Sequence, residues 1–256
     1  MNDNLFLNGM GFSIVMTVLL ALAACAQQAD KKPARPEEGV VTTPEPASAP
    51  PVAAPVPADK TAARQSYSIN AASSDIRIFV YRKGNLSRLG HDHVISAGAI
   101  SGRILLADNI GESELDLSIP VTSLVVDDPE VRQQAGLESG SQPSEKDMAS
   151  TRHAMLSPKV LDAERFGSVK VHAQVVGGTL AELELNVTMT IHGVKQQFRS
   201  PVTVEKTPQQ ITASGSFQIL QSDFGITPFS VLAGALALKD EVKIQYRIVA
   251  AIKTQQ

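Results

Sequence analysis

The chain is poor in aromatic residues and has no basic segment, and each shortage excludes a class of function. It has no Trp, and aromatic residues make up 4% of its 256 residues. Proteins that bind single-stranded nucleic acid stack bases on aromatic side chains, so we expect no such platform here. The net charge is −3, without a run of Lys and Arg, which argues against nucleic acid as a partner.

The chain also has a single cysteine, Cys25, which excludes an intrachain disulfide framework. The apolar run from Gly11 to Ala24 precedes it, too short for a comfortable membrane span but typical of a signal-peptide core. The sequence Leu22-Ala23-Ala24-Cys25 resembles the bacterial lipobox, in which the Cys is acylated and becomes the mature N-terminus. We therefore predict a signal peptide at residues 1–24 and lipidation of Cys25. The alternative is a buried Cys in an uncleaved helix.

The residue after Cys25 bears on the location of the protein. Cys25 is followed by Ala26 and not by an Asp. This resembles the sorting pattern of Gram-negative outer-membrane lipoproteins. Several acyl chains on one residue can hold a protein on a bilayer, whereas one chain cannot. The prediction is a periplasmic protein, bound to the outer membrane through acylated Cys25.

A proline-rich segment follows. Residues 26–65 contain eight prolines and no aromatic residue. Proline among Ala, Val and Thr favours an extended chain over a helix or a sheet. We therefore predict that residues 25–65 are the lipidated Cys and a linker, and that residues 66–256 form the folded domain.

From Tyr67 onward, apolar residues recur at every second position, which indicates half-buried antiparallel strands. The alternation is clearest at 76–81, 115–121, 183–191 and 242–248, and further strands are expected near 92–106, 168–176, 197–205 and 210–220. The pair Gly177-Gly178 predicts a tight hairpin between two of them. The side chains expected to be buried on these strands include Leu115, Leu117, Leu183, Leu185, Val187, Val242 and Ile244.

One segment breaks the strand pattern. Ser144 is suited to be a helix N-cap, Asp147 follows three residues later, and Pro158 would end the helix. Met148, Met155 and Leu156 would form its apolar stripe. The preceding polar stretch, residues 127–142, is expected to be a long loop of the kind that is usually functional or mobile.

These elements predict an all-β fold, a closed antiparallel barrel of about eight strands with one short helix insertion. Closure removes the exposed sheet edges. A barrel of eight strands is filled by side chains or holds one small ligand. Because few aromatic residues are available to fill it, the composition favours a carrier of a hydrophobic ligand. No Ser-His-Asp or Cys-His arrangement is supported, so we expect no catalytic residues and no enzyme activity.

Two of the five histidines lie in the stretch Gly90-His91-Asp92-His93. In an extended backbone, residues two apart point to the same face, so the rings of His91 and His93 would converge while Asp92 points away. Three interpretations stay open: a structural pair, a polar site for a ligand's head group, and a site for zinc, copper or haem. A metal would need a further ligand, for which His192 is the first candidate and His153 on the helix is the second.

Three segments resemble the signatures of the YceI family, and together they cover the chain from about Tyr67 to Ile252. The resemblance implies an eight-stranded lipocalin-like barrel, exported to the periplasm, in a family with members that enclose a polyisoprenoid chain. The stretch around His91 makes this chain a variant with a doubled histidine. The three segments are Thr188-Met189-Thr190-Ile191-His192-Gly193-Val194-Lys195, Phe217-Gln218-Ile219-Leu220-Gln221-Ser222-Asp223-Phe224-Gly225-Ile226 and Leu238-Lys239-Asp240-Glu241-Val242-Lys243-Ile244.

With this resemblance, the candidate ligand-binding residues are His91, Asp92, His93 and His192. The expected ligand is an isoprenoid or another lipid, and a homodimer is left open. Two other functions stay as alternatives. One is a metal- or redox-linked periplasmic protein that uses His91, His93 and His192 as ligands, and the other is an envelope stress factor without a ligand.

Overall fold

The computed structural model describes residues 64–137 and 142–252, which lie in one compact unit, residues 57–256. The predicted signal peptide, Cys25 and most of the linker lie outside the described residues. The helices are α1 (Pro129–Gln134) and α2 (Glu145–Leu156). The strands are β1 (Arg64–Ile69), β2 (Asp75–Lys83), β3 (His93–Ala97), β4 (Ser101–Ala107), β5 (Glu114–Pro120), β6 (Leu124–Val126), β7 (Ser168–Gly178), β8 (Glu182–Ile191), β9 (Val194–Lys206), β10 (Gln210–Leu220), β11 (Ser230–Val231) and β12 (Leu236–Ile252).

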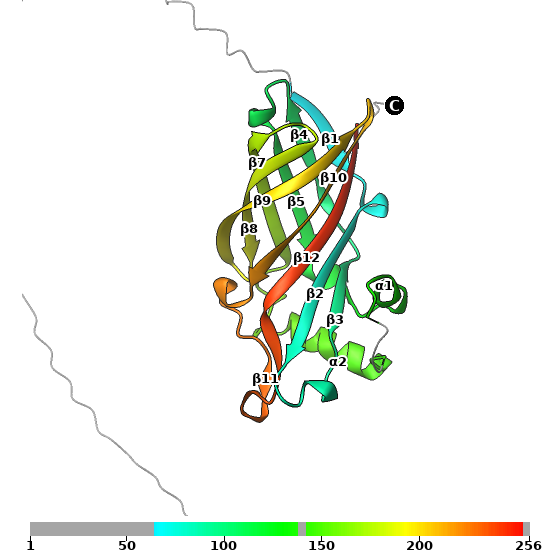
Figure 1. The fold of residues 1–256 in the computed structure, drawn as a ribbon, viewed down its shortest axis with the longest axis vertical. Coiled ribbons are helices and arrows are strands. Elements are labelled where there is room, and N and C mark those ends of the chain that lie inside the picture. Colours follow the sequence, from blue (N-terminus) through cyan, green and yellow to red (C-terminus); the bar gives the residue numbers. More distant parts are fainter. Residues whose placement is uncertain (1–63, 138–141, 253–256) are drawn as a thin grey trace, which may run out of the picture. The chain divides into compact units, whose positions relative to one another are not determined.

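Eight of these strands form a closed antiparallel barrel (Figure 1). Hydrogen bonds join them in the order β1, β4, β5, β7, β8, β9, β10 and β12, and β1 pairs with β12 to close the ring. The strand β12 is 17 residues long, so β1 pairs with its last residues and β2 with its earlier part. The predicted all-β, eight-stranded barrel is therefore confirmed.

At the end of the barrel where β12 begins, the wall is extended by β2, β3 and β6. Helix α2 packs beside β6, and its Met155 is buried in the main core with Leu124 and Val126. The Arg152 guanidinium ties the helix to the Thr122 carbonyl at 2.7 Å. No helix among the described residues is long and apolar enough to cross a membrane.

The single strand expected near residues 92–106 is two strands, β3 and β4, which pair with different neighbours. The break falls after Ala97, where the N–H of Gly98 donates to the Ser123 carbonyl at 2.9 Å. A Cβ on Gly98 would lie 2.6 Å from that carbonyl oxygen, so only glycine permits the approach. Residues 94–102 contain no Pro, Asp, Asn, Lys, Arg or Glu that would mark a turn, which is why the sequence alone did not reveal the break.

The helix predicted from Ser144 is confirmed as α2. Ser144 accepts from the Asp147 N–H, and the Asp147 carboxylate accepts from the Ser144 N–H, which completes a capping box. The loop expected at residues 127–142 is wrong in part, because it contains α1. Asp128 caps that helix by accepting from two N–H groups, and Pro129 occupies its first turn.

The burial expected on the strands is confirmed for Leu117, Leu183, Val187, Val242 and Ile244 and wrong for Leu115 and Leu185. Both of these leucines point inward but stay partly exposed, because they line the cavity inside the barrel. The hairpin between β7 and β8 is also confirmed. Its turn lies just after the two glycines, where Thr179 and Glu182 exchange backbone hydrogen bonds of 2.9 and 3.1 Å.

Candidate ligand-binding cavity

The barrel encloses a cavity of about 650 Å³. Inward-facing aliphatic side chains of nearly every barrel strand form its wall, because alternate residues of each strand face the interior. This volume is within the range of pockets that enclose one small molecule. The lining of the barrel's interior includes Ile78, Ile104, Leu115, Leu117, Val169, Val171, Leu185, Val187, Met189, Phe217, Ile219, Val242 and Ile244.

The cavity has an apolar closed end and a polar open end. Lining residues near the far end of β12, such as Ala173, Val202 and Ile248, are buried. The lining residues that are exposed on the surface lie at the other end, on α2 and on the segments after α2 and β10: Ser150, Ala154, Lys159, Thr227 and Phe229. Arg82, His91 and His93 line the cavity at this same end. The polar groups are thus concentrated at the mouth.

One hydroxyl lies inside the otherwise apolar part. Tyr246 on β12 lines the cavity, and its ring packs 6.0 Å from that of Phe217. Burial raises the pKa of the Tyr246 hydroxyl, and a hydrogen bond with Ser200 opposes the rise in part. The ring lies over Gly215 of the neighbouring strand, where a Cβ would approach the hydroxyl to 2.6 Å. The small residue leaves the space that this ring occupies.

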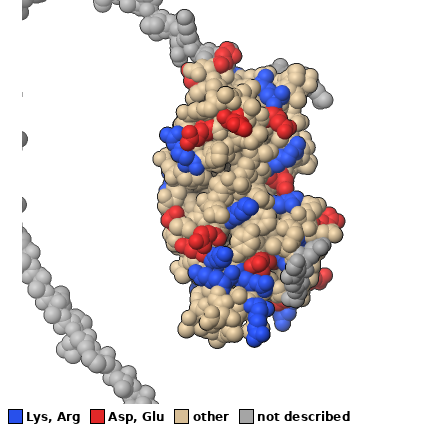
Figure 2. Space-filling view, viewed as in Figure 1, with Lys and Arg blue, Asp and Glu red and all other residues tan. Residues whose placement is uncertain are grey.

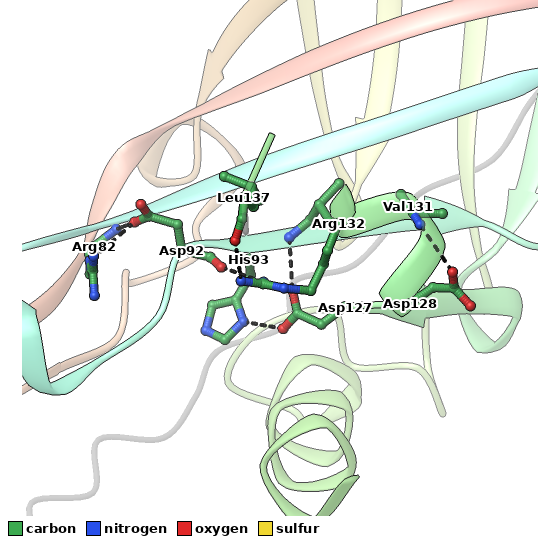
Figure 3. Close-up of polar contacts among 9 residues, drawn as sticks. Arg82, Asp92, His93, Asp127, Asp128, Val131, Arg132 and Leu137 are labelled. Carbon is green, nitrogen blue, oxygen red and sulfur yellow. Dashed lines mark hydrogen bonds and ion pairs between the residues drawn. The ribbon is translucent and has the colours of Figure 1, made fainter. Parts of the chain in front are cut away.

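A buried charged cluster supports the mouth (Figure 3). Asp127, at the end of β6, is 0% exposed. Its Oδ2 lies 2.6 Å from Nδ1 of His93, and its Oδ1 accepts from the Arg132 guanidinium at 2.7 Å and from the Val94 N–H at 3.0 Å. Arg132 on α1 also donates to the Asp92 and Leu137 carbonyls at 2.8 and 3.1 Å. The cluster therefore joins β3, β6 and α1.

These contacts keep the carboxyl of Asp127 ionised. Burial alone would raise its pKa, but the hydrogen bond and charge of His93, the Val94 N–H and the Arg132 guanidinium together hold the pKa below its ordinary value. A carboxylate only accepts hydrogen bonds, so Nδ1 of His93 carries the proton. With Nδ1 bound to Asp127, Nε2 is the ring nitrogen that can contact a ligand in the cavity that His93 lines.

Asp92 is oriented away from its two histidine neighbours, as predicted. It accepts a hydrogen bond of 2.8 Å from the Arg82 N–H and lies 3.7 Å from the Arg82 guanidinium, which also donates to the Gly90 carbonyl. The structure thus brings His91, His93 and Arg82 to the cavity mouth and gives Asp92 the role of holding Arg82. Arg82 was not among the residues predicted from the sequence.

His192 does not join the other two histidines. It lies between β8 and β9 in a tight turn, where His192 and Gly193 have φ of 51° and 75°, the positive signs of a type I′ hairpin. Its ring packs edge-on against Phe166 at 5.3 Å, and it is not part of the cavity lining. His153 is exposed on α2.

No group of three or more His, Cys, Asp or Glu side chains that could hold a metal ion is found within residues 64–137 and 142–252. The alternative of a metal site made of His91, His93 and His192 is therefore not supported by the described residues. The turn places the ring of His192 against Phe166, and this ring does not line the cavity.

Comparison with known proteins agrees with this architecture. A family model, the YceI-like domain, matches residues 67–250. The chain belongs to the YceI family. No curated protein sequence matches it. The crystal structure of BcnA from Burkholderia cenocepacia is similar with a TM-score of 0.54 at 14% identity, over 72% of this chain and 99% of that one. The YceI protein of Campylobacter jejuni is similar over 62% and 85% of the chains, with a TM-score of 0.45 at 15% identity.

In this YceI-family chain, the signature segments build turns at the ends of strands. The Ile191-His192-Gly193-Val194 motif forms the type I′ turn, and a Cβ on Gly193 would lie 2.5 Å from the Phe166 ring. The second segment places Phe224 in the core, 1% exposed, while Asp240 accepts from the N–H of Ser222 at 2.9 Å. The YceI-like fold is that of a barrel that binds ligands.

Proposed function

We propose that the protein is a non-enzymatic carrier that holds one long apolar ligand, of the polyisoprenoid class, inside its barrel. The observation that carries the proposal is the cavity of about 650 Å³, apolar apart from the Tyr246 hydroxyl and with its charged side chains at one end. A chain-shaped ligand with one polar end fits this distribution, because its apolar part would lie among the aliphatic side chains. Its polar end would then reach Arg82, His91 and His93.

The size of the cavity supports a resident ligand on energetic grounds. An empty apolar void destabilises a protein by roughly 24 cal/mol per Å³. When the cavity is empty, the aliphatic side chains of its wall lack packing partners on their inner side. Water gains little in a space with so few hydrogen-bonding partners. An apolar ligand removes most of this cost.

Titration calorimetry with a long-chain isoprenoid alcohol tests the proposal. We expect saturation at one molecule per chain and a negative heat-capacity change, since apolar surface is buried on binding. Failure to saturate, or equal binding by a short-chain alcohol that cannot reach the apolar end, would contradict it.

His93→Asn separates recognition of the ligand's polar end from stability. The Asn amide can still donate to Asp127, but the second polar atom of the ring, Nε2, is lost. We expect ligand affinity to fall about tenfold, the effect of a lost hydrogen bond of roughly 1–1.5 kcal/mol. The unfolding midpoint should change little. The same loss of affinity in His172→Asn would show that the effect is not specific, since His172 lies on the outer face of β7, 2.9 Å from Asp116.

We further propose that the carrier is held on the periplasmic side of the outer membrane by acyl chains on Cys25. The support is the Leu22-Ala23-Ala24-Cys25 box, followed by a proline-rich linker. In cells supplied with a labelled fatty acid, the wild-type protein should incorporate the label and Cys25→Ser should incorporate none. Equal labelling of the two proteins would exclude lipidation at this residue.

A further inference from the structure

The mouth of the cavity carries an unusual concentration of exposed apolar side chains. Eight large hydrophobic side chains are exposed in the described part of the chain, and four of them, Leu89, Phe229, Val231 and Leu232, lie in two short segments at this end. Leu89 is 65%, Phe229 54% and Leu232 66% exposed. Scattered exposed leucines need no explanation, but a cluster indicates a surface that contacts something.

These side chains belong to one feature, which we call the apolar tip, residues 86–90 and 229–234. The Leu86 N–H donates to the Ala235 carbonyl at 2.8 Å, which joins the two segments. Val231 on β11 pairs with Leu236 at the start of β12, and Phe229 also lines the cavity. In Figure 1, β11 and the turn after it lie at the extreme end of the barrel. The tip is therefore the rim of the mouth.

The backbone holds the tip in a strained form. Leu232 and Ala233 both have φ near 50°, the left-handed conformation that non-glycine residues rarely adopt. In this turn the side chain of Leu232 is exposed to solvent. Strain that keeps an apolar side chain in solvent is unfavourable for stability alone, and it points to a function.

Positive charge surrounds the tip. Residues 82–90 and 226–239 contain Arg82, Lys83, Arg88 and Lys239 and no Asp or Glu. Lys83, Arg88 and Lys239 are exposed, and Lys159 is exposed across the mouth. Figure 2 shows several basic side chains, with some acidic ones among them, over the lower part of the molecule, above a largely uncharged end. Arg82 is paired with Asp92, and Lys83 lies near Asp240, whereas Arg88 and Lys239 lie beside the tip in segments without acidic residues. An apolar projection beside exposed cations matches a bilayer, whose anionic head groups lie above its hydrocarbon.

We propose that the apolar tip docks on the surface of a membrane that contains anionic lipid, with Leu89, Phe229 and Leu232 among the head groups and the mouth facing the bilayer. In this position a ligand can pass between the bilayer and the cavity without crossing water. That use of the docked state rests on the proposed function, whereas docking itself requires no ligand.

Because the chain has no Trp, a single introduced Trp reports its own environment without background. The full chain with Leu89→Trp is mixed with vesicles of phosphatidylglycerol and brominated phosphatidylcholine. Its matched control is Leu180→Trp, at a residue 40% exposed in the turn after β7, at the opposite end of the barrel. We expect a blue shift and quenching of Leu89→Trp and neither in Leu180→Trp. An anchor or linker that merely tethers the chain would not produce this difference.

Two further variants test the role of charge. In the Leu89→Trp background, Lys83→Gln and Arg88→Gln should each raise the lipid concentration for half-quenching roughly fivefold, and about 25-fold together. Vesicles without phosphatidylglycerol should quench weakly. Equal quenching of Leu89→Trp and Leu180→Trp, or quenching of neither, would overturn the proposal, and the second outcome would make a protein the partner to seek. Loss of isoprenoid binding with intact quenching would instead overturn the proposed function alone.

Discussion

Asp127→Asn is expected to lower the free energy of unfolding by about 3–5 kcal/mol, because it leaves the charge of Arg132 buried without its partner. Asp127 is fully buried, and Arg132 is 4% exposed. The neutral amide also donates where the carboxylate accepted, so its contact with either His93 or Arg132 becomes unfavourable. Urea unfolding followed by circular dichroism measures the loss.

The chain supplies a matched control on its surface. Asp116 has a similar pair of partners, with its carboxylate 2.9 Å from His172 and 3.7 Å from Arg103, but it is 47% exposed. Asp116→Asn should cost less than about 1 kcal/mol, since exposed ion pairs contribute little. If the two Asn variants lose the same stability, the buried cluster does not hold the mouth as described.

The loss of stability at low pH also depends on Asp127. The folded-state pKa of Asp127 lies below its ordinary value. The contribution of Asp127 to the free energy of unfolding is therefore complete above the pKa of the unfolded state, near 3.9. This contribution is lost as the pH falls through the pKa of the folded state. The wild type should lose stability in this range, and Asp127→Asn should lose less of it. The carboxyls of Asp147 and Asp240, whose pKa values are also lowered, retain their own contribution in both proteins.

Leu185→Trp is expected to weaken ligand binding by about 50-fold while the barrel stays folded. Leu185 faces the hollow and is only half buried, so the larger ring occupies space that is open in the wild type. If it displaces about three methylene groups of the ligand, at roughly 0.8 kcal/mol each, the loss is about 2.4 kcal/mol. Calorimetric titration measures it.

The control is Val176→Trp on the neighbouring strand β7, where the side chain is exposed on the outer surface. It adds the same ring without entering the cavity, so ligand affinity should stay within twofold of the wild type. Unchanged affinity in Leu185→Trp would mean that the ligand does not occupy this part of the barrel. Leu185→Ala should cost less than an ordinary core truncation, because Leu185 is only partly buried and its truncation loses less buried apolar surface.

Much of the barrel could be predicted from local patterns. The alternation in β8 and β12 fixed the facing of Leu183, Val187 and Ile244, and the Ser144 and Asp147 pair marked the start of α2. Alternation has no information on whether an inward residue meets another side chain or a void. This is why Leu115 and Leu185 were expected to be buried and are not.

The candidate site was predictable in part. The spacing of His91 and His93 correctly indicated that both reach one region, the cavity mouth. Asp127 was missed, because Asp127 and Asp128 are adjacent and only the tertiary structure shows that one is buried under His93 while the other caps α1. The Asp128-Pro129 pair was a usable helix-start signal. His192 was misplaced because its turn conformation, not its position at a strand end, directs its ring.

Native mass spectrometry of the protein purified from its own envelope in mild detergent tests the central claim most directly. The wild type should carry one molecule of an apolar, isoprenoid-containing lipid per chain, and Leu185→Trp should carry little or none while Val176→Trp keeps it. Detection of the wild-type protein without any bound lipid would contradict the proposal that the ligand lies in the barrel. Retention of the lipid to the same extent by Leu185→Trp would also contradict it.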